Sequence, residues 1–154
     1  MERTGIWVLG GHQTDFARNR ARAGLEFADL TREVVDGALA AAGVGPDAVE
    51  VIHVGNAFGR LFTGQGRLGG MPATVEPGLW GVPAARHEAA CASGGVAVLA
   101  AMADLEAGRY DRAQMTDGGA GVVLVTDRRP RAPGPPGAGG SPGSHQIEEG
   151  TDGR

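Results

Sequence analysis

The amino-acid sequence predicts an α/β fold with a mostly parallel sheet and helices on its faces. Apolar runs at 5–10 and 49–54 each end in glycine, which is typical of buried strands that enter loops. Between them, residues 27–42 repeat apolar side chains at spacings of three and four, the pattern of an amphipathic helix, and Gly43 follows where that helix should end. The order strand, helix, strand favours a parallel βαβ unit.

The next segment, residues 59–80, is rich in glycine and contains Pro72 and Pro77, so we expect only short helices there. Within it, residues 64–69 match the G-x-G-x-x-G pattern of dinucleotide sites. That pattern should follow a strand directly and open a helix, but here it stands well beyond the second apolar run and shortly before a proline. We therefore predict a loop and no nucleotide site.

The chain has one cysteine, Cys91, at the start of a small-residue segment that runs to residue 107 and is followed by Gly108. We expect a helix here, entered from a loop and a short extended segment at 80–86. Cys91 would then lie at or just before a helix N-terminus, where unpaired N–H groups and the helix dipole favour a thiolate.

An isolated cysteine in an apolar helix is more often a small buried residue with no chemical role. The pair Gly94 and Gly95 argues against that interpretation at Cys91. Each glycine costs about 1 kcal/mol of helix propensity relative to alanine, so their presence indicates that a ligand or another backbone comes close.

The residues around Cys91 resemble the nucleophile segment of the thiolases, the acyl-CoA acyltransferases. The resemblance rests on CASG at 91–94 and AMADLEAGRYD at 101–111, and it also covers GIWVLGGHQTDF at 5–16 and VGNAFG at 54–59. Many thiolases have an asparagine three residues before the cysteine. Here that residue is Glu88, which is similar to the sterol-carrier-like branch.

The resemblance implies an incomplete thiolase-like N-terminal domain in which Cys91 is the catalytic nucleophile. It implies that the thiolate takes an acyl group from acyl-CoA as a thioester, with coenzyme A thioester as substrate and no other cofactor. Thiolases also use a histidine in a GHP motif, an asparagine motif and a second cysteine in a glycine-rich motif, none of which this sequence contains. Thiolases form dimers or tetramers, but a shortened chain need not assemble.

The resemblance breaks after residue 111. In thiolases an apolar core strand follows at once, whereas residues 112–127 resemble a later turn and strand of the fold, so the sequence indicates an internal deletion with a junction near 111–115. We expect that residues 122–125 can occupy the vacant strand position. We assign residues 1–127 to the domain and 128–154 to a disordered tail rich in proline and glycine, either a genuine flexible tail or the product of a shifted reading frame.

Composition restricts the partners and the compartment. The formal net charge is −4 with no basic patch, which argues against nucleic acid, and no apolar run reaches the length of a membrane span. A single cysteine excludes an internal disulfide, and the N-terminus lacks the pattern of a secretion signal, so we expect a cytoplasmic protein.

None of the four histidines has metal-ligand spacing, so we predict no metal site. His12 is expected after the first strand and His53 within the second. His87, four residues before Cys91, is more often a structural residue than a catalytic one, and Glu88 would be only a polar neighbour.

Two functions remain open. The first is a thiolase-type acyltransferase that is impaired or inactive as an isolated chain. The second is a non-catalytic remnant or subunit-interaction fragment. A redox-sensing thiol is disfavoured because Cys91 has no resolving cysteine.

Overall fold

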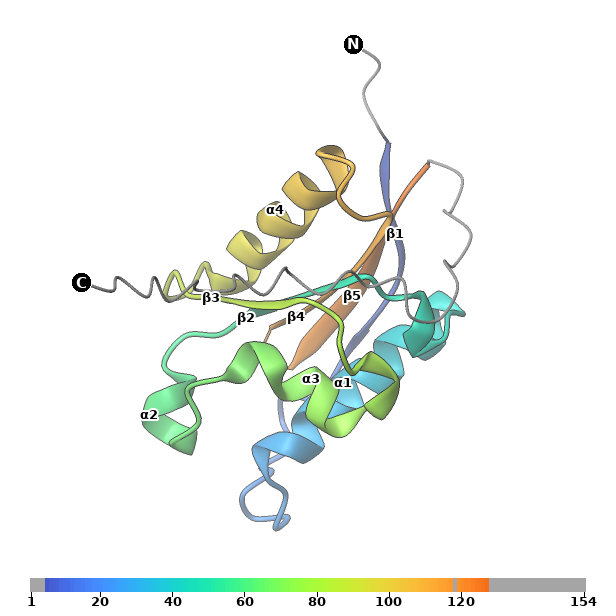
Figure 1. Cartoon of the computed structure of the whole chain (residues 1–154). Coiled ribbons are helices and arrows are strands. Elements are labelled where there is room, and N and C mark those ends of the chain that lie inside the picture. The colour runs from blue at the N-terminus through green and yellow to red at the C-terminus, as the bar shows by residue number, and fades with distance from the viewer. Residues whose placement is uncertain (1–4, 118, 128–154) are drawn as a thin grey trace, which may run out of the picture.

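Five strands form one mixed sheet in the order β1-β5-β4-β2-β3 in the computed structural model, which describes residues 5–117 and 119–127 (Figure 1). The strands are β1 (Ile6–Gln13), β2 (Val51–Gly55), β3 (Ala84–His87), β4 (Arg112–Asp117) and β5 (Ala120–Thr126). β2 pairs in parallel with β3 and β4, while β5 is antiparallel to β1 and β4. Four of the five strands therefore point the same way, which confirms the predicted mostly parallel α/β sheet.

Helices cover both faces of this sheet. α1 (Phe27–Ala42) and α3 (Met71–Val75) lie on one face and α4 (Ser93–Glu106) lies on the other (Figure 1). Among the described residues, every helix is too short or too polar to cross a bilayer. The predicted tail, residues 128–154, lies outside the described residues.

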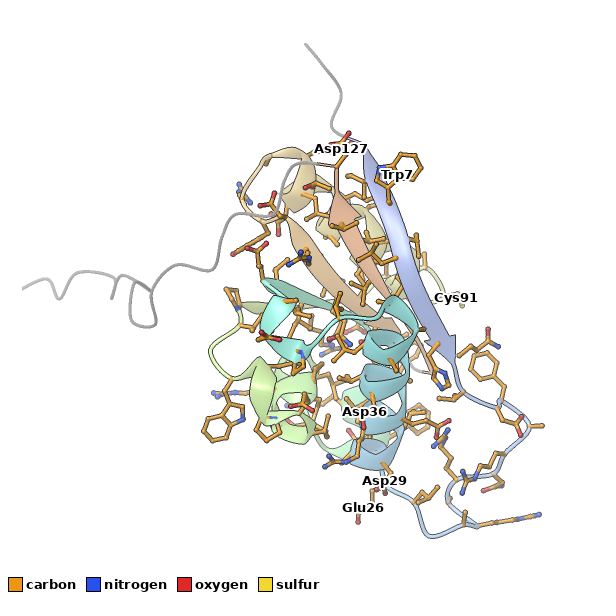
Figure 2. All side chains as sticks on the ribbon, turned by 90° about the vertical axis from the view of Figure 1, so that its right-hand side faces the viewer. Trp7, Glu26, Asp29, Asp36, Cys91 and Asp127 are labelled. Carbon is orange, nitrogen blue, oxygen red and sulfur yellow. The ribbon has the colours of Figure 1, made fainter. Side chains whose placement is uncertain are left out.

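Helix α1 has the bounds that its apolar periodicity predicts. At its start, the Asp29 carboxylate accepts a hydrogen bond of 2.8 Å from the Glu26 N–H, and both residues are seen at that end of the helix in Figure 2. At its end, Gly43 takes the left-handed conformation with φ of 66°, which few other residues adopt without strain.

The strand β2 lies at the centre of the domain, and all five of its residues are buried. Because successive side chains point to opposite faces of a strand, Ile52 and Val54 join a core under α1 while Val51 joins a second core under α4. The α1 side also contains Val35, Leu39, Leu68, Leu79 and Val123, and the α4 side contains Ala101, Leu105, Ala113, Met115 and Leu124.

Residues 59–80 form only short helical pieces, as predicted. They are α2 (Gly59–Thr63), α3, and single 3-10 turns at Leu68–Gly70 and Pro77–Leu79; a third such turn, Pro46–Ala48, precedes β2. The G-x-G-x-x-G pattern at 64–69 follows α2 and not a strand, so it lacks the surroundings that a dinucleotide site needs.

The strand that follows α4 is made by residues 112–117, and the expectation that 122–125 would occupy this position was wrong. β4 pairs in parallel with β2 from Val51↔Ala113 to Gly55↔Asp117, whereas 122–125 lie in β5, the antiparallel strand between β4 and β1. A strand at this position must pair with β2 on one side and β5 on the other. Helix α4 lies antiparallel to β2, so the residues directly after α4 reach this position without a further crossover. The side-chain pattern of 112–117 is not typical of a strand, but backbone pairing with β2 and β5 stabilises the extended conformation of this segment.

A second difference concerns the first strand. It continues to Gln13, so His12 lies within β1 and not after it. The reason is the long antiparallel pairing with β5, which extends to Gln13↔Ala120. His12 is held by contact with Gly37 of α1 and lies 3.8 Å from Glu33, so it belongs to the helix α1 face of the sheet.

Candidate functional site

Cys91 lies in the short turn that joins the edge strand β3 to helix α4. The strand ends at His87, the helix begins at Ser93 with Ala92 as its N-cap, and the free thiol of Cys91 is exposed. The predicted placement just before a helix N-terminus is confirmed. At its far end, α4 is closed by Gly108 in the left-handed conformation with φ of 69°, also as predicted.

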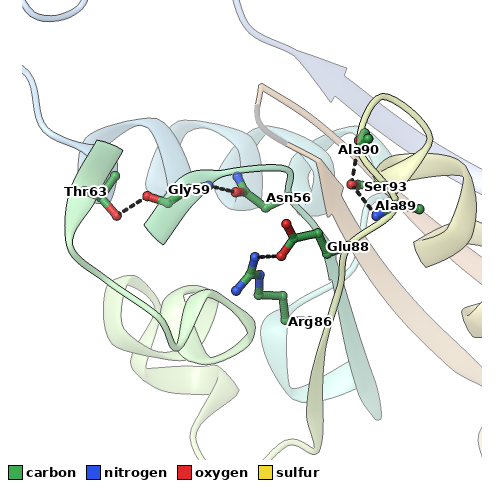
Figure 3. A network of polar contacts seen from close by, with 8 residues as sticks. All are labelled: Asn56, Gly59, Thr63, Arg86, Glu88, Ala89, Ala90 and Ser93. Carbon is green, nitrogen blue, oxygen red and sulfur yellow. Dashed lines mark hydrogen bonds and ion pairs between the residues drawn. The ribbon is translucent and has the colours of Figure 1, made fainter. Parts of the chain in front are cut away.

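The turn before Cys91 is strained and tightly held. Ala90 has a φ of 48°, a left-handed conformation that costs a residue with a Cβ about 1–2 kcal/mol. The Ser93 hydroxyl holds this turn: it accepts from the Ala89 N–H at 2.9 Å and donates to the Ala90 carbonyl at 2.7 Å (Figure 3). The Ala92 N–H adds a bond of 2.9 Å to the Ala89 carbonyl. The residue directly before Cys91 is therefore fixed from both sides.

The N-terminus of α4 lies directly against the end of β2. A Cβ on Gly55 would stand 2.6 Å from the Ser93 carbonyl oxygen and 2.8 Å from the Gly94 Cα. The expectation that a backbone comes close to the Gly94 and Gly95 pair is thus met at Gly94, and the approaching backbone is that of β2. Gly95 has open space around it and lines an apolar groove of about 230 Å³ between α4 and strands β4 and β5.

Beside this turn, two histidines from neighbouring strands are in contact. The buried His53, on β2, places Nδ1 2.8 Å from Nε2 of His87 on β3, and the tautomer decides which nitrogen donates. His53 Nε2 lies 3.3 Å from an Asp104 carboxylate oxygen on α4, close enough for a charge interaction though not aligned as a hydrogen bond. The other oxygen of Asp104 accepts a bond of 2.8 Å from Arg109.

The electrostatics of this cluster favour an uncharged His53. Burial lowers the pKa of His53 because it removes water from the charged ring, and the nearby His87 lowers it further. The Asp104 carboxylate acts in the opposite direction but does not prevail. With His53 uncharged, the 2.8 Å contact is a single hydrogen bond whose donor depends on the tautomers.

The sequence placed His53 inside the second strand correctly but gave it no partner. The contact with His87 could have been anticipated from the register of two parallel neighbours, because His53 pairs with Ala85 and His87 stands two positions further on the same face. Asp104 lies far away in the sequence and carries no comparable signal. For His87 itself, this contact fits the structural role that the sequence favoured.

Two other polar groups surround the turn (Figure 3). Glu88 is exposed and bonds to Arg86, as expected of a polar neighbour. Asn56, at the end of β2, donates its N–H to the His87 carbonyl at 3.0 Å and accepts from the Gly59 N–H at 2.7 Å. Within the described ranges, no three or more acidic, histidine or cysteine side chains gather as ligands for a metal ion.

The fold and the site define an α/β protein that presents one cysteine thiol at a strained turn from a strand into a helix. The chain belongs to the thiolase family: the model of the family described as "Thiolase, N-terminal domain" matches residues 6–115. The family recognised from the sequence is thereby confirmed, while the assignment to its sterol-carrier-like branch stays a prediction.

Two sequence relatives agree with this family. The chain is 33% identical over 122 residues to the acetyl-CoA acetyltransferase of Methanothermobacter thermautotrophicus, and 34% identical over 106 residues to that of Methanocaldococcus jannaschii. These matches cover 79% and 69% of this chain but only 30% and 26% of the relatives. This chain therefore spans less than a third of the length of either relative.

A solved structure supports the fold. The acetyl-CoA acetyltransferase from Syntrophomonas wolfei superposes with a TM-score of 0.59 at 22% identity, covering 74% of this chain and 28% of that one. At such identity the likeness concerns the fold.

Proposed function

We propose that Cys91 takes an acyl group from an acyl-CoA thioester, as the nucleophile of a thiolase-type acyltransferase. The thiolate sulfur attacks the thioester carbonyl carbon, a new carbon–sulfur bond forms to Cys91, and the bond to the coenzyme A sulfur breaks. Coenzyme A leaves as a thiolate and takes a proton from water. Membership of the thiolase family supports this reaction.

The observation that carries the proposal is the geometry of Cys91. Its thiol is exposed, the preceding Ala90 is fixed in a strained conformation, and the N-terminus of α4 begins two residues later. The positive end of the helix dipole favours negative charge on the sulfur, and a fixed turn spares the loss of conformational freedom on reaction. An inert structural cysteine would instead be expected to lie buried.

We propose further that the isolated chain acylates itself slowly and does not turn over at the rate of complete relatives. The histidine, asparagine and second cysteine motifs that thiolases use are absent from the sequence. Losing an oxyanion donor costs roughly 10²–10³-fold in rate, and a general acid–base partner contributes about 10²–10⁴-fold. We place this chemistry in the cytoplasm, in lipid metabolism, without a further cofactor.

Intact mass spectrometry of the whole chain mixed with acetyl-CoA tests the proposal. We expect one acetyl group per molecule, located on Cys91 by peptide mapping and absent from Cys91→Ala. Iodoacetamide labelling of the same sample shows that the thiol is reactive. A thiol that iodoacetamide labels but acetyl-CoA leaves unmodified would refute acyl transfer. Repeated thiolysis or condensation turnovers that vanish in Cys91→Ser would refute the expected impairment.

The alternative function, a non-catalytic subunit-interaction fragment, is favoured by exposed apolar side chains. Trp7 at 63% exposure and Val8 at 65% lie on the edge strand β1, and Trp7 points away from the sheet (Figure 2). Leu99 on α4 is exposed to a similar extent. Light scattering on the purified chain distinguishes the alternatives: a stable dimer or tetramer that Trp7→Ser and Leu99→Ser disrupt, together with no acetylation of Cys91, would favour the fragment.

A further inference from the structure

The two histidines and Asp104 connect three elements that surround the Cys91 turn. His53 comes from the buried strand β2, His87 from the end of the edge strand β3, and Asp104 from helix α4. Within the described sheet β3 pairs only with β2, so contacts with β2 and the residue after it hold the end of β3 in place. It receives two contacts there: the His53–His87 bond at 2.8 Å, and the bond of 3.0 Å from Asn56 to the His87 carbonyl.

The His53–His87 contact can hold only one hydrogen. With both rings neutral, one nitrogen donates and the other accepts. A first added proton leaves this bond intact, because it binds at an outer nitrogen, either on His87 or on the His53 nitrogen that faces Asp104. A second proton would place two N–H groups against each other at 2.8 Å, so the rings would have to separate.

The separation would act on the chain that leads to Cys91. Only residues 88–90 stand between His87 and the cysteine, and the Ser93 hydroxyl binds both Ala89 and Ala90. The strained φ of Ala90 is maintained only while these surroundings hold it. A shift of His87 therefore reaches the left-handed residue directly before the thiol.

In the described part of the chain, the charged and titratable groups that face His53 come from two elements. His87 faces it from β3 and Asp104 from α4, with Arg109 behind Asp104 at 2.8 Å. On β4 the residue paired with His53 is Met115, which carries no charge. Because burial and His87 lower the pKa of His53, its protonation belongs to the range below about pH 6.5, the ordinary value for histidine.

We propose that His53 and His87 are positioning residues for Cys91, whose shared hydrogen holds the turn in its reactive form and whose double protonation releases it. The inference deepens the proposed acyl transfer and rests on Cys91 as the nucleophile. It makes the reactivity of the thiolate depend on a histidine pair outside the turn that carries the thiol.

The test compares iodoacetamide alkylation rates of Cys91 in the whole chain and in His87→Gln, from about pH 7.5 down to about pH 5, on either side of an ordinary histidine pKa. Glutamine keeps a polar atom near the position of His87 Nε2 but does not titrate in this range. Taking the ratio of the two rates cancels the ionisation of the thiol. We expect the ratio of wild type to His87→Gln to fall by about fivefold or more in acid, the lower limit of ordinary coupling between sites.

Two controls keep the outcome clear. His12→Gln removes a histidine of β1 outside this cluster, and its ratio to wild type should stay constant with pH. If His87→Gln does not fold, NMR titration of the wild type replaces it. The amide signals of residues 89–92 should then shift with the same midpoint as the ring of His53.

The inference would be overturned if the ratio of the wild-type to the His87→Gln alkylation rate stayed constant with pH. It would also be overturned if the amide signals of residues 89–92 did not shift as the His53 ring titrates. Acetylation by acetyl-CoA is measured separately. A pH-dependent alkylation ratio without acetylation refutes the proposed function alone, and acetylation with a constant ratio refutes the positioning role alone.

Discussion

Replacement of Gln114 by methionine should stabilise the protein, although it removes a polar side chain. Gln114 lies in the middle of β4 and is 0% exposed, and neither its amide nitrogen nor its carbonyl oxygen has a hydrogen-bond partner among the residues that the structure describes. Its neighbours across the sheet are Ile52 on β2 and Val123 on β5, both in the core under α1. A buried amide without partners costs free energy that methionine, of similar length and flexible, does not incur.

The expected gain follows from these contacts. Each unsatisfied buried polar group costs about 1–3 kcal/mol, so removing two such atoms can stabilise the protein by several kcal/mol. Imperfect packing of the new side chain reduces this gain. We expect the free energy of unfolding to rise by about 2 kcal/mol. For a domain of this size that corresponds to an increase in melting temperature of roughly 8 °C.

Urea unfolding followed by far-UV circular dichroism measures the effect. Tryptophan fluorescence is a poor probe because Trp7 and Trp80 are already largely exposed in the folded protein. Gln13→Met, at an exposed position of β1, is the matched control and should change the free energy of unfolding by less than about 0.5 kcal/mol. A Gln114→Met protein no more stable than wild type, at an unchanged denaturant slope, would show that the amide is satisfied in solution and that the reasoning is wrong.

Three further predictions concern the site. The free energy of unfolding should decrease as the pH falls below about 6.5, because the lowered pKa of His53 means that the unfolded chain binds the proton more readily. Urea midpoints measured at several pH values should show this decrease, and the decrease should be smaller in His53→Gln. Gly55→Ala should lower the free energy of unfolding by about 1–3 kcal/mol, because its Cβ would stand 2.6 Å from the Ser93 carbonyl oxygen. Gly70→Ala, at a position with open space for a Cβ, should not lower it, and thermal melts of the two variants distinguish them. Ser93→Ala should lose about 1–2 kcal/mol in urea titrations, because two bonds to the strained turn disappear, and an unchanged midpoint would contradict this.

The sequence predicts best those elements whose local residue pattern favours the same conformation as their packing in the folded protein. Helix α1 has an apolar face of the right period and a glycine where it stops, so its bounds 27–42 are found from the sequence alone. The turn at Cys91 was also located, because a short extended run, a cysteine and a long small-residue helix follow one another directly.

β4 was missed because its own residues argue against a strand. Arg112, Gln114 and Thr116 are polar at alternate positions, and the last two are nevertheless buried. Pairing with β2 on one side and β5 on the other decides the conformation, and neither partner is visible in a local window. The same limit applies to His53 and Asp104, whose contact joins β2 to a helix that begins 38 residues after that strand ends.

The position of β5 between β4 and β1 also fixes the order in which the chain can be completed. Among the described strands β1 is made before the others, yet within the described sheet it pairs only with β5, from Ile6↔Thr126 to Gln13↔Ala120. At a synthesis rate of about 5–20 residues per second, β1 therefore waits roughly 6–24 s for its partner, with Trp7 and Val8 open to other chains. During that interval the edge of β1 is a site at which a nascent molecule can pair wrongly, and α1, which packs on β1 and follows it in the chain, can cover one face of the strand.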